Sequence, residues 1–168
     1  QGQRVGTIYD STGGVIAELK NERNIRYLTS EEIPQNVKDA FVSVEDKRFY
    51  KHNGVDFFAL TRAVTKLINK DAITQGGSTI TQQLARNVFL SHEVSWQRKV
   101  KEMFIAWEIE KMYSKDQILE FYVNNICYAN AFYGLEAASK GYFNKPSSEL
   151  SLSQLCYLCA IPNSPEYY

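Results

Sequence analysis

From residue 34 onward the apolar residues recur at helical spacing, and this pattern constrains the fold more than any other feature. Val37, Phe41 and Val44 follow Pro34 at intervals that place them on one face of a helix ending near Val44. Later apolar patterns are preceded by residues that can cap the start of a helix: Asp56, Ser78, Ser95, Ser114 and Ser151. A glutamine follows three residues after each of the last two, which is the spacing of a capping box. The sequence therefore predicts a mainly α-helical domain.

The expected helices vary in length. After Ser95 we expect a long helix with Val100, Phe104 and Trp107 on its apolar face. Shorter helices are expected near 116–125 and 134–142. The polar, glycine-containing residues 69–77 predict a loop.

The first 32 residues have a different pattern. Residues 7–10 and 15–19 flank a turn at 11–14, which is typical of a short β-hairpin. We therefore expect a β element and linker over residues 1–32 and a helical domain over residues 33–168. No signal-peptide pattern opens the sequence, its apolar runs are shorter than the roughly 18–20 residues that cross a bilayer, and both ends look cut. We interpret the chain as an excised soluble domain, whatever anchor its parent carries.

Charge and cysteine content argue against several classes of function. The 19 basic residues balance 19 acidic ones, which does not favour a nucleic-acid-binding protein. Three cysteines do not make a disulfide framework. Cys156 and Cys159 fall in an apolar helix pattern, which favours two small buried side chains on one helix face. With only His52 and His92 to join them, a zinc site is not favoured.

Two adjacent carboxylates, Glu45 and Asp46, stand where the first helix is expected to end. The negative end of the helix dipole and partial burial would both raise a carboxyl pKa, which suits a general acid or base. The alternative is a solvated acidic patch beside Lys47 and Arg48, and spacing alone favours this alternative.

A second polar cluster follows two glycines. Gly76 and Gly77 precede Ser78, the expected cap of the third helix, so unpaired backbone N–H groups and the positive end of a helix would meet there. The hydroxyl, amide and guanidinium groups that could hold a pyrophosphate or a sugar come from Ser78, Thr79, Gln82, Gln83 and Arg86. The spacing is not that of a P-loop. An ordinary capped helix is the alternative, although it accounts less readily for so many polar groups.

The third cluster consists of Arg98, Lys99 and Glu102. On a helix, Glu102 lies one turn from both cations. The cluster fits an ordinary surface ion pair, and it also fits a carboxylate held between cations in a site that binds a phosphate or a metal. Taken alone, this segment does not decide between the two.

Together these segments resemble a known family. The patterns E-D-x-x-F-x-x-H-x-G at 45–54, G-G-S-T-I-T-Q-Q-L at 76–84 and R-K-x-x-E at 98–102 resemble the first three signature motifs of peptidoglycan glycosyltransferases (glycosyltransferase family 51). These are the transglycosylase domains of class A penicillin-binding proteins and of monofunctional glycosyltransferases. Further resemblances cover 114–124 with 133–138, and 150–155 running to 158–162. Residues 8–16 resemble the linker-like segment of bifunctional members, which favours a class A parent over a monofunctional one.

The sequence departs from the family pattern at two places. Arg86 stands where many members carry a lysine, so a cation is kept with a forked instead of a point-charge geometry. Residues 127–131 replace a glycine-containing loop, which affects the expected acceptor contacts but not the expected chemistry.

The resemblance implies a lysozyme-like helical fold with a smaller, membrane-proximal jaw subdomain. It implies an enzyme that polymerises lipid II into β-1,4 glycan strands with inversion and release of undecaprenyl pyrophosphate. The implied partners are lipid II, the growing lipid-linked strand, the bacterial cytoplasmic membrane and other cell-wall synthesis proteins, with no nucleic acid. The implied location is the outer face of that membrane, with a transmembrane anchor outside this sequence.

The resemblance also assigns roles to residues. Glu45 would take the proton from the acceptor sugar's 4-hydroxyl, and Glu102 would orient the neighbouring cations or help to bind a divalent cation. The residues expected to bind substrate are Asp46, Phe49, His52, Ser78, Thr79, Gln82, Gln83, Arg86, Arg98 and Lys99. No cofactor is required by this assignment, and a Mg or Mn ion at Glu102 is left open.

Other readings of the same residues remain. A lysozyme-like glycan hydrolase would also be helical with a catalytic glutamate, but it has no use for a pyrophosphate site. A non-catalytic glycan-binding module would not need the paired carboxylates. Residues 55–73, with Phe57 and Phe58, form either a helix that dips into the membrane interface or an ordinary core-facing amphipathic helix.

Overall fold

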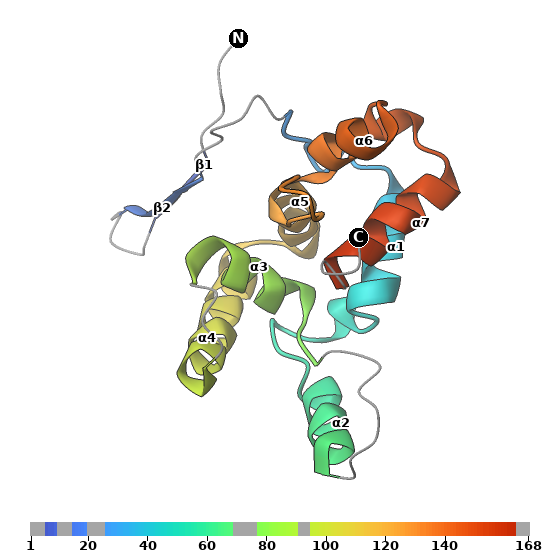
Figure 1. The fold of residues 1–168 in the computed structure, drawn as a ribbon. Coiled ribbons are helices and arrows are strands. Elements are labelled where there is room, and N and C mark those ends of the chain that lie inside the picture. Colours follow the sequence, from blue (N-terminus) through green and yellow to red (C-terminus); the bar gives the residue numbers. More distant parts are fainter. Residues whose placement is uncertain (1–5, 10–14, 20–25, 69–76, 91–94, 164–168) are drawn as a thin grey trace.

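The computed structural model describes residues 6–9, 15–19, 26–68, 77–90 and 95–163. The expected turn at 11–14 and the expected loop at 69–77, except Gly77, lie outside these residues. The described part contains seven α-helices and is mainly helical, as predicted (Figure 1). None of these helices is long and apolar enough to cross a membrane.

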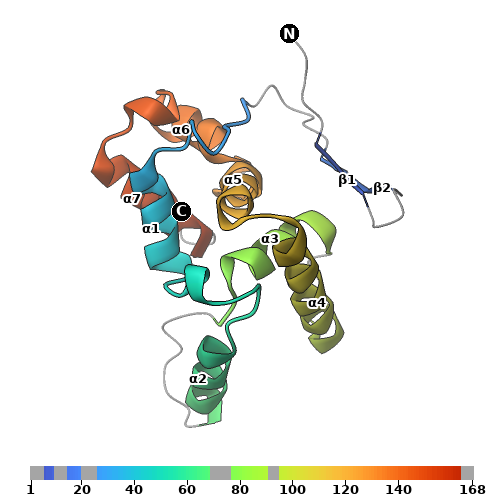
Figure 2. The same ribbon diagram turned by 180° about the vertical axis from the view of Figure 1, so that it is seen from behind.

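The helices follow one another along the chain with short 3-10 turns between some of them. They are α1 (Gln35–Glu45), α2 (Phe57–Ile68), α3 (Ile80–Phe89), α4 (Trp96–Met112), α5 (Lys115–Asn125), α6 (Leu135–Phe143) and α7 (Leu152–Ala160). The 3-10 turns are η1 (Phe49–Lys51), η2 (Ser147–Glu149) and η3 (Ile161–Asn163). Near the start of the chain, β1 (Gly6–Tyr9) and β2 (Val15–Leu19) pair antiparallel, with Gly6 opposite Leu19. In both ribbon views this pair and α2 extend away from the remaining helices (Figures 1 and 2).

Capping side chains explain where most of these helices begin. Ser95, Ser114 and Ser151 each cap the helix that follows, and the last two form the predicted capping boxes with Gln117 and Gln154. The predicted cap of α3 is wrong. Thr79, and not Ser78, caps this helix, because the glutamine that completes the box is three residues after Thr79.

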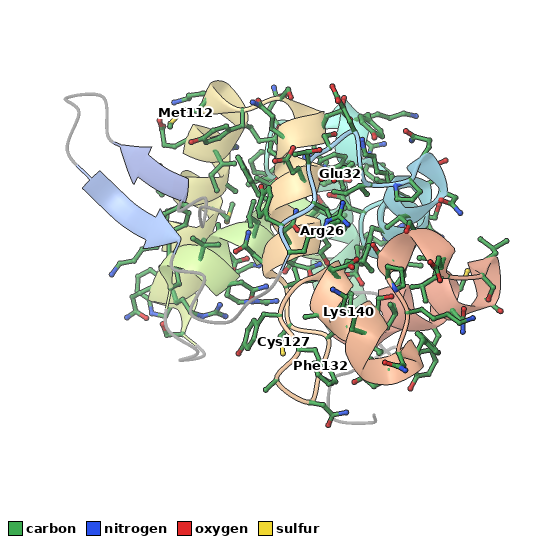
Figure 3. All side chains as sticks on the ribbon, turned by 90° about the horizontal axis from the view of Figure 1, so that it is seen from above. Arg26, Glu32, Met112, Cys127, Phe132 and Lys140 are labelled. Atoms are coloured by element: carbon green, nitrogen blue, oxygen red, sulfur yellow. The ribbon has the colours of Figure 1, made fainter. Side chains whose placement is uncertain are left out.

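The hydrophobic core lies between α1, α3, α5, α6 and α7. Its fully buried side chains include Val37, Phe41, Ile80, Ile118, Leu119, Tyr122, Tyr128, Leu135 and Leu158. Two rings pack edge-to-face on Phe41, with Tyr122 at 5.6 Å and Tyr128 at 6.2 Å between ring centroids. The segment before α1 joins this core through Leu28 and Ile33, and Arg26 and Glu32 form an ion pair there at 2.7 Å (Figure 3).

Two sequence-based expectations about buried faces are wrong. The buried face of α4 consists of Glu102, Ala106 and Ile109, whereas Val100 and Phe104 are exposed. Apolar periodicity marks a stripe on a helix but does not say whether that stripe faces the core. In α7, Cys159 is buried as expected but Cys156 is exposed, because the buried face of this helix consists of Leu155, Leu158 and Cys159.

The loop between α5 and α6 has an unusual backbone conformation. Ala129, Asn130 and Ala131 all have left-handed backbone angles, with φ of 59°, 46° and 59°. Such a conformation strains residues that carry a Cβ. An antiparallel bridge between Cys127 and Tyr133 closes the loop.

Candidate active site

Glu45 is the last residue of α1, where the chain leaves the helical core. Its Oε2 accepts a hydrogen bond from Gln83 Nε2 on α3 at 2.8 Å, while its Oε1 is buried and has no hydrogen-bond partner among the described residues. Burial raises the pKa of this carboxyl above its ordinary value; the hydrogen bond from Gln83 and the charge of Arg86 lower it, and the charge of Asp46 raises it. Glu45 is therefore not part of a solvated acidic patch. It has the raised proton affinity that suits a base.

Asp46 and His52 connect the end of α1 to the start of α3. Asp46 is buried, and its Oδ2 accepts hydrogen bonds from His52 Nε2 at 2.9 Å and from the backbone N–H of Ile80 at 3.1 Å. Because His52 Nδ1 accepts from the backbone N–H of Gly54, the proton of the neutral ring lies on Nε2. Two predicted substrate-binding side chains are thus directed into the protein.

Phe49 and Gly54 fix the loop that follows. Phe49 is fully buried, and the Lys115 ammonium lies 4.3 Å from the centre of its ring. Gly54 has φ of 93°, and a Cβ there would lie 2.8 Å from the carbonyl carbon of Ala106, so only glycine fits against α4. The geometry gives Phe49 a packing role close to the site.

The start of α3 divides its polar residues into two groups. Thr79 and Gln82 are buried, and they bond each other in the capping box. Ser78 lies just before this cap, and its hydroxyl accepts a hydrogen bond from Lys99 Nζ on α4 at 2.7 Å. Of the residues predicted to bind the glycosyl donor, Ser78 therefore contacts the cationic cluster, while Thr79 and Gln82 cap the start of α3.

The cationic cluster is Arg98, Lys99 and Glu102 at the start of α4. Glu102 is completely buried; its Oε2 lies 3.2 Å from Arg98 Nη1, and its Oε1 accepts from Lys99 Nζ. The Arg98 and Lys99 side chains are 15% and 32% exposed, so this is not an ordinary surface ion pair. Two cations share one anion, and the buried Nε–H of Arg98 has no partner among the described residues. The cluster thus keeps one unit of positive charge and a spare donor for an anionic ligand.

Each oxygen of Glu102 contacts one cation, Oε2 that of Arg98 and Oε1 that of Lys99. The described residues contain no group of three or more His, Cys, Asp and Glu side chains that could hold a metal.

Helix α3 brings the two parts of the site together. Ser78, before its first turn, contacts the cationic cluster, and Gln83 in that turn contacts Glu45. The residues from Ile80 to Gln83 span only about 5 Å of helix axis, and Ser78 lies two residues before Ile80, so both contacts are made at the start of α3. Arg86 follows on the same helix, makes no ion pair with another described residue, and adds positive charge near Glu45. A carboxylate of raised pKa and a cationic cluster therefore both contact the start of α3.

One contact of the site was not predicted from the sequence. The hydroxyl of Tyr122 on α5 donates to Gln83 Oε1 at 3.1 Å. In the sequence this tyrosine belongs to a helical apolar pattern, which gives no signal of a polar role. The missing information is tertiary, because 39 positions separate the two residues.

Comparison with known proteins identifies relatives over almost the whole chain. The transglycosylase family model matches residues 12–168. Penicillin-binding protein 4 of Bacillus subtilis is 41% identical over 162 residues, which cover 96% of this chain and 26% of the relative. Penicillin-binding protein 1F of the same organism is 45% identical over 161 residues, which cover 96% of this chain and 22% of the relative. Penicillin-binding protein 1A of Escherichia coli is 41% identical over 161 residues, which cover 96% of this chain and 19% of the relative. The chain thus spans about a quarter or less of these relatives.

Proposed function

Because the chain belongs to the transglycosylase family, we propose that it polymerises lipid II into peptidoglycan glycan strands. The growing strand, linked to its lipid through a pyrophosphate, is the donor, and the incoming lipid II is the acceptor. The single observation that carries this proposal is the placement of Glu45 and the cationic cluster on two sides of the first turn of α3.

The proposed reaction exchanges one bond for another at the donor sugar. Glu45 takes the proton of the acceptor 4-hydroxyl as that oxygen attacks the donor anomeric carbon. A β-1,4 C–O bond forms with inversion, the bond to the pyrophosphate breaks, and its electron pair leaves with the lipid pyrophosphate. The added negative charge of the leaving group is stabilised by Arg98, Lys99 and the Ser78 hydroxyl.

The remaining site residues divide by exposure. Arg86 is partly exposed and makes no ion pair within the described part of the chain, so we assign it to the substrate phosphates or sugars. The buried residues have a structural role, because they hold the loop after α1 against α3 and α4. They are Asp46, Phe49, His52, Thr79 and Gln82. We assign no cofactor, since Lys99 and Arg98 supply the charge that a divalent cation would provide.

Incubation with purified lipid II tests the proposed function directly. We expect long glycan products that lysozyme digests, together with one released lipid pyrophosphate for each bond formed. Cleavage of finished glycan without polymerisation would instead identify a hydrolase. Binding of glycan with no change in either substrate would identify a binding module.

We further propose that α2 and the exposed face of α4 form the membrane-proximal jaw of a lysozyme-like fold. Phe57 and Phe58 are 56% and 65% exposed, which argues against an ordinary core-facing helix. Phe57 contacts Trp107, which contacts the exposed Phe104, so the aromatic surface continues from α2 onto α4. An open cavity of about 360 Å³ beside Phe57 and Phe58 is also lined by Lys51, whose charge suits anionic lipid, and by Arg48, which pairs with Asp56 at 3.0 Å.

Serine in place of both Phe57 and Phe58 should weaken binding to vesicles of phosphatidylglycerol and phosphatidylcholine by roughly 10-fold or more, because two large apolar side chains no longer enter the interface. Vesicle flotation measures this partitioning. Leu152→Ser is the matched control, since Leu152 is 63% exposed on α7, outside the aromatic surface. Equal flotation of the double variant and the wild type would contradict the membrane assignment.

The segment before α1 completes the proposed domain organisation. We propose that residues 1–32 connect the domain to its membrane anchor on the outer face of the cytoplasmic membrane, in a class A parent. The last residues of this segment are fastened to α5, because Glu120 accepts from the Tyr27 hydroxyl and from the Ser30 backbone N–H, and Asn124 bonds both backbone groups of Leu28.

A further inference from the structure

A chain of two hydrogen bonds ends on the proposed base. The hydroxyl of Tyr122 donates to Gln83 Oε1 at 3.1 Å, and Gln83 Nε2 donates to Glu45 Oε2 at 2.8 Å. The three residues come from α5, α3 and α1. This chain therefore ties the carboxylate to two other helices of the core.

The tyrosine helps to fix which way the glutamine amide points. A glutamine side chain can present either its oxygen or its NH2 group to a neighbour. With the tyrosine hydroxyl donating to the amide oxygen, the NH2 group is left facing Glu45. Tyr122 is itself fully buried and packs edge-to-face on Phe41, so its hydroxyl has little freedom to move.

We propose that Tyr122 is a positioning residue for the glycosyl transfer reaction, acting through Gln83 to hold Glu45 Oε2 so that Oε1 is the oxygen that accepts the substrate proton. This inference rests on the proposed function of Glu45 as a base. It is supported by the contrast between the two oxygens, since Oε2 has its donor and Oε1 has no partner among the described residues. An acceptor hydroxyl would supply that missing partner.

The groups that surround Glu45 make Gln83 the contact through which Tyr122 controls the carboxylate. Asp46 and Arg86 contribute opposite charges. The Tyr122 phenol and the Cys159 thiol also lie close enough to interact, but burial raises the pKa of both groups, that of Cys159 to about 12, so both stay neutral in the working range. Tyr122→Phe removes no charge. It removes only the bond that orients the amide.

Tyr122→Phe should lower kcat for lipid II polymerisation about 10-fold with KM little changed, the size expected for a weakened hydrogen bond to a charged group. The acid limb of kcat/KM against pH should also move to higher pH. The bond from Gln83 favours the ionised carboxylate, so losing it raises the pKa of Glu45 and a higher pH is needed to ionise the base. Tyr128→Phe is the matched control, because Tyr128 is equally buried on the same Phe41 ring but its hydroxyl donates to a backbone carbonyl.

Gln83→Leu completes a double-mutant cycle. It should cause the same acid-limb shift, and Tyr122→Phe added to it should cost nothing more, because the tyrosine acts only through the amide. The proposal is overturned if Tyr122→Phe matches Tyr128→Phe in rate and pH profile. It is also overturned if the fold-losses in kcat of Tyr122→Phe and Gln83→Leu multiply in the double variant. If Tyr122→Phe does not fold, an unshifted acid limb in Gln83→Leu overturns it. Near-normal polymerisation by Glu45→Gln would instead reject the base itself, which separates failure of the proposed function from failure of this inference.

Discussion

Glu45→Gln should lower the rate of lipid II polymerisation by roughly 100-fold or more, the usual contribution of a general base. The amide keeps the size of the side chain and can still accept the hydrogen bond from Gln83, but it cannot take a proton. The expected loss is in kcat, with substrate binding retained. Single-turnover measurement with saturating lipid II checks this, and a rate within a few-fold of the wild type would contradict it.

The same substitution should not lower stability. A carboxyl whose pKa is raised by folding binds protons more tightly in the folded state. The free energy of unfolding therefore falls as the pH rises above 4.5, the ordinary pKa of the carboxyl, and through its higher pKa in the folded state. At pH 7 the ionised Glu45 therefore lowers the free energy of unfolding of the wild type, whereas Glu45→Gln lacks this loss. We expect its melting temperature at pH 7 to equal or exceed that of the wild type. A clear decrease would mean that Glu45 stabilises the fold.

Glu102→Gln should cause the second large loss, in both activity and stability. The buried carboxylate holds Arg98 and Lys99 together, and removing its charge leaves two cations without their shared anion. Breaking a buried ion pair costs about 3–5 kcal/mol, and the displaced cations would no longer hold the leaving pyrophosphate. We expect polymerisation to fall at least about 100-fold at a temperature where the variant is still folded.

Glu110→Gln separates the two effects of the Glu102 substitution. Glu110 is a second buried carboxylate on α4, and it pairs with Lys115 at 2.7 Å and accepts from the Thr81 hydroxyl at 2.6 Å. Its substitution should lower the melting temperature by a similar amount and leave polymerisation close to normal. If each variant loses activity in proportion to the decrease in its melting temperature, Glu102 has only a structural role.

Local signals explain how much of the fold was predictable. The capping boxes at Ser114 and Ser151 depend on residues three apart, and both were predicted correctly. The same rule applied at α3 would have selected Thr79 over Ser78, since Gln82 follows Thr79 at the required spacing. The error there lay in reading the first hydroxyl after the glycines as the cap.

Tertiary contacts explain what the sequence did not predict. Whether Glu102 is a surface or a buried carboxylate depends on which face of α4 packs against α3, and the apolar residues Val100 and Phe104 suggested the wrong face. The hydrogen bonds of Asp46 to Ile80 and of Tyr122 to Gln83 join segments 34 and 39 positions apart. No local pattern encodes them, so the proposed division between residues that contact substrate and residues that position them depends on the structure.

A structure of the Glu45→Gln variant bound to lipid II would test the proposed geometry of the site. We expect the donor pyrophosphate to lie against Arg98, Lys99 and Ser78, and an acceptor sugar hydroxyl to lie within hydrogen-bond distance of the side chain at position 45. A pyrophosphate bound away from the start of α4, or a side chain at position 45 turned away from the sugars, would contradict it.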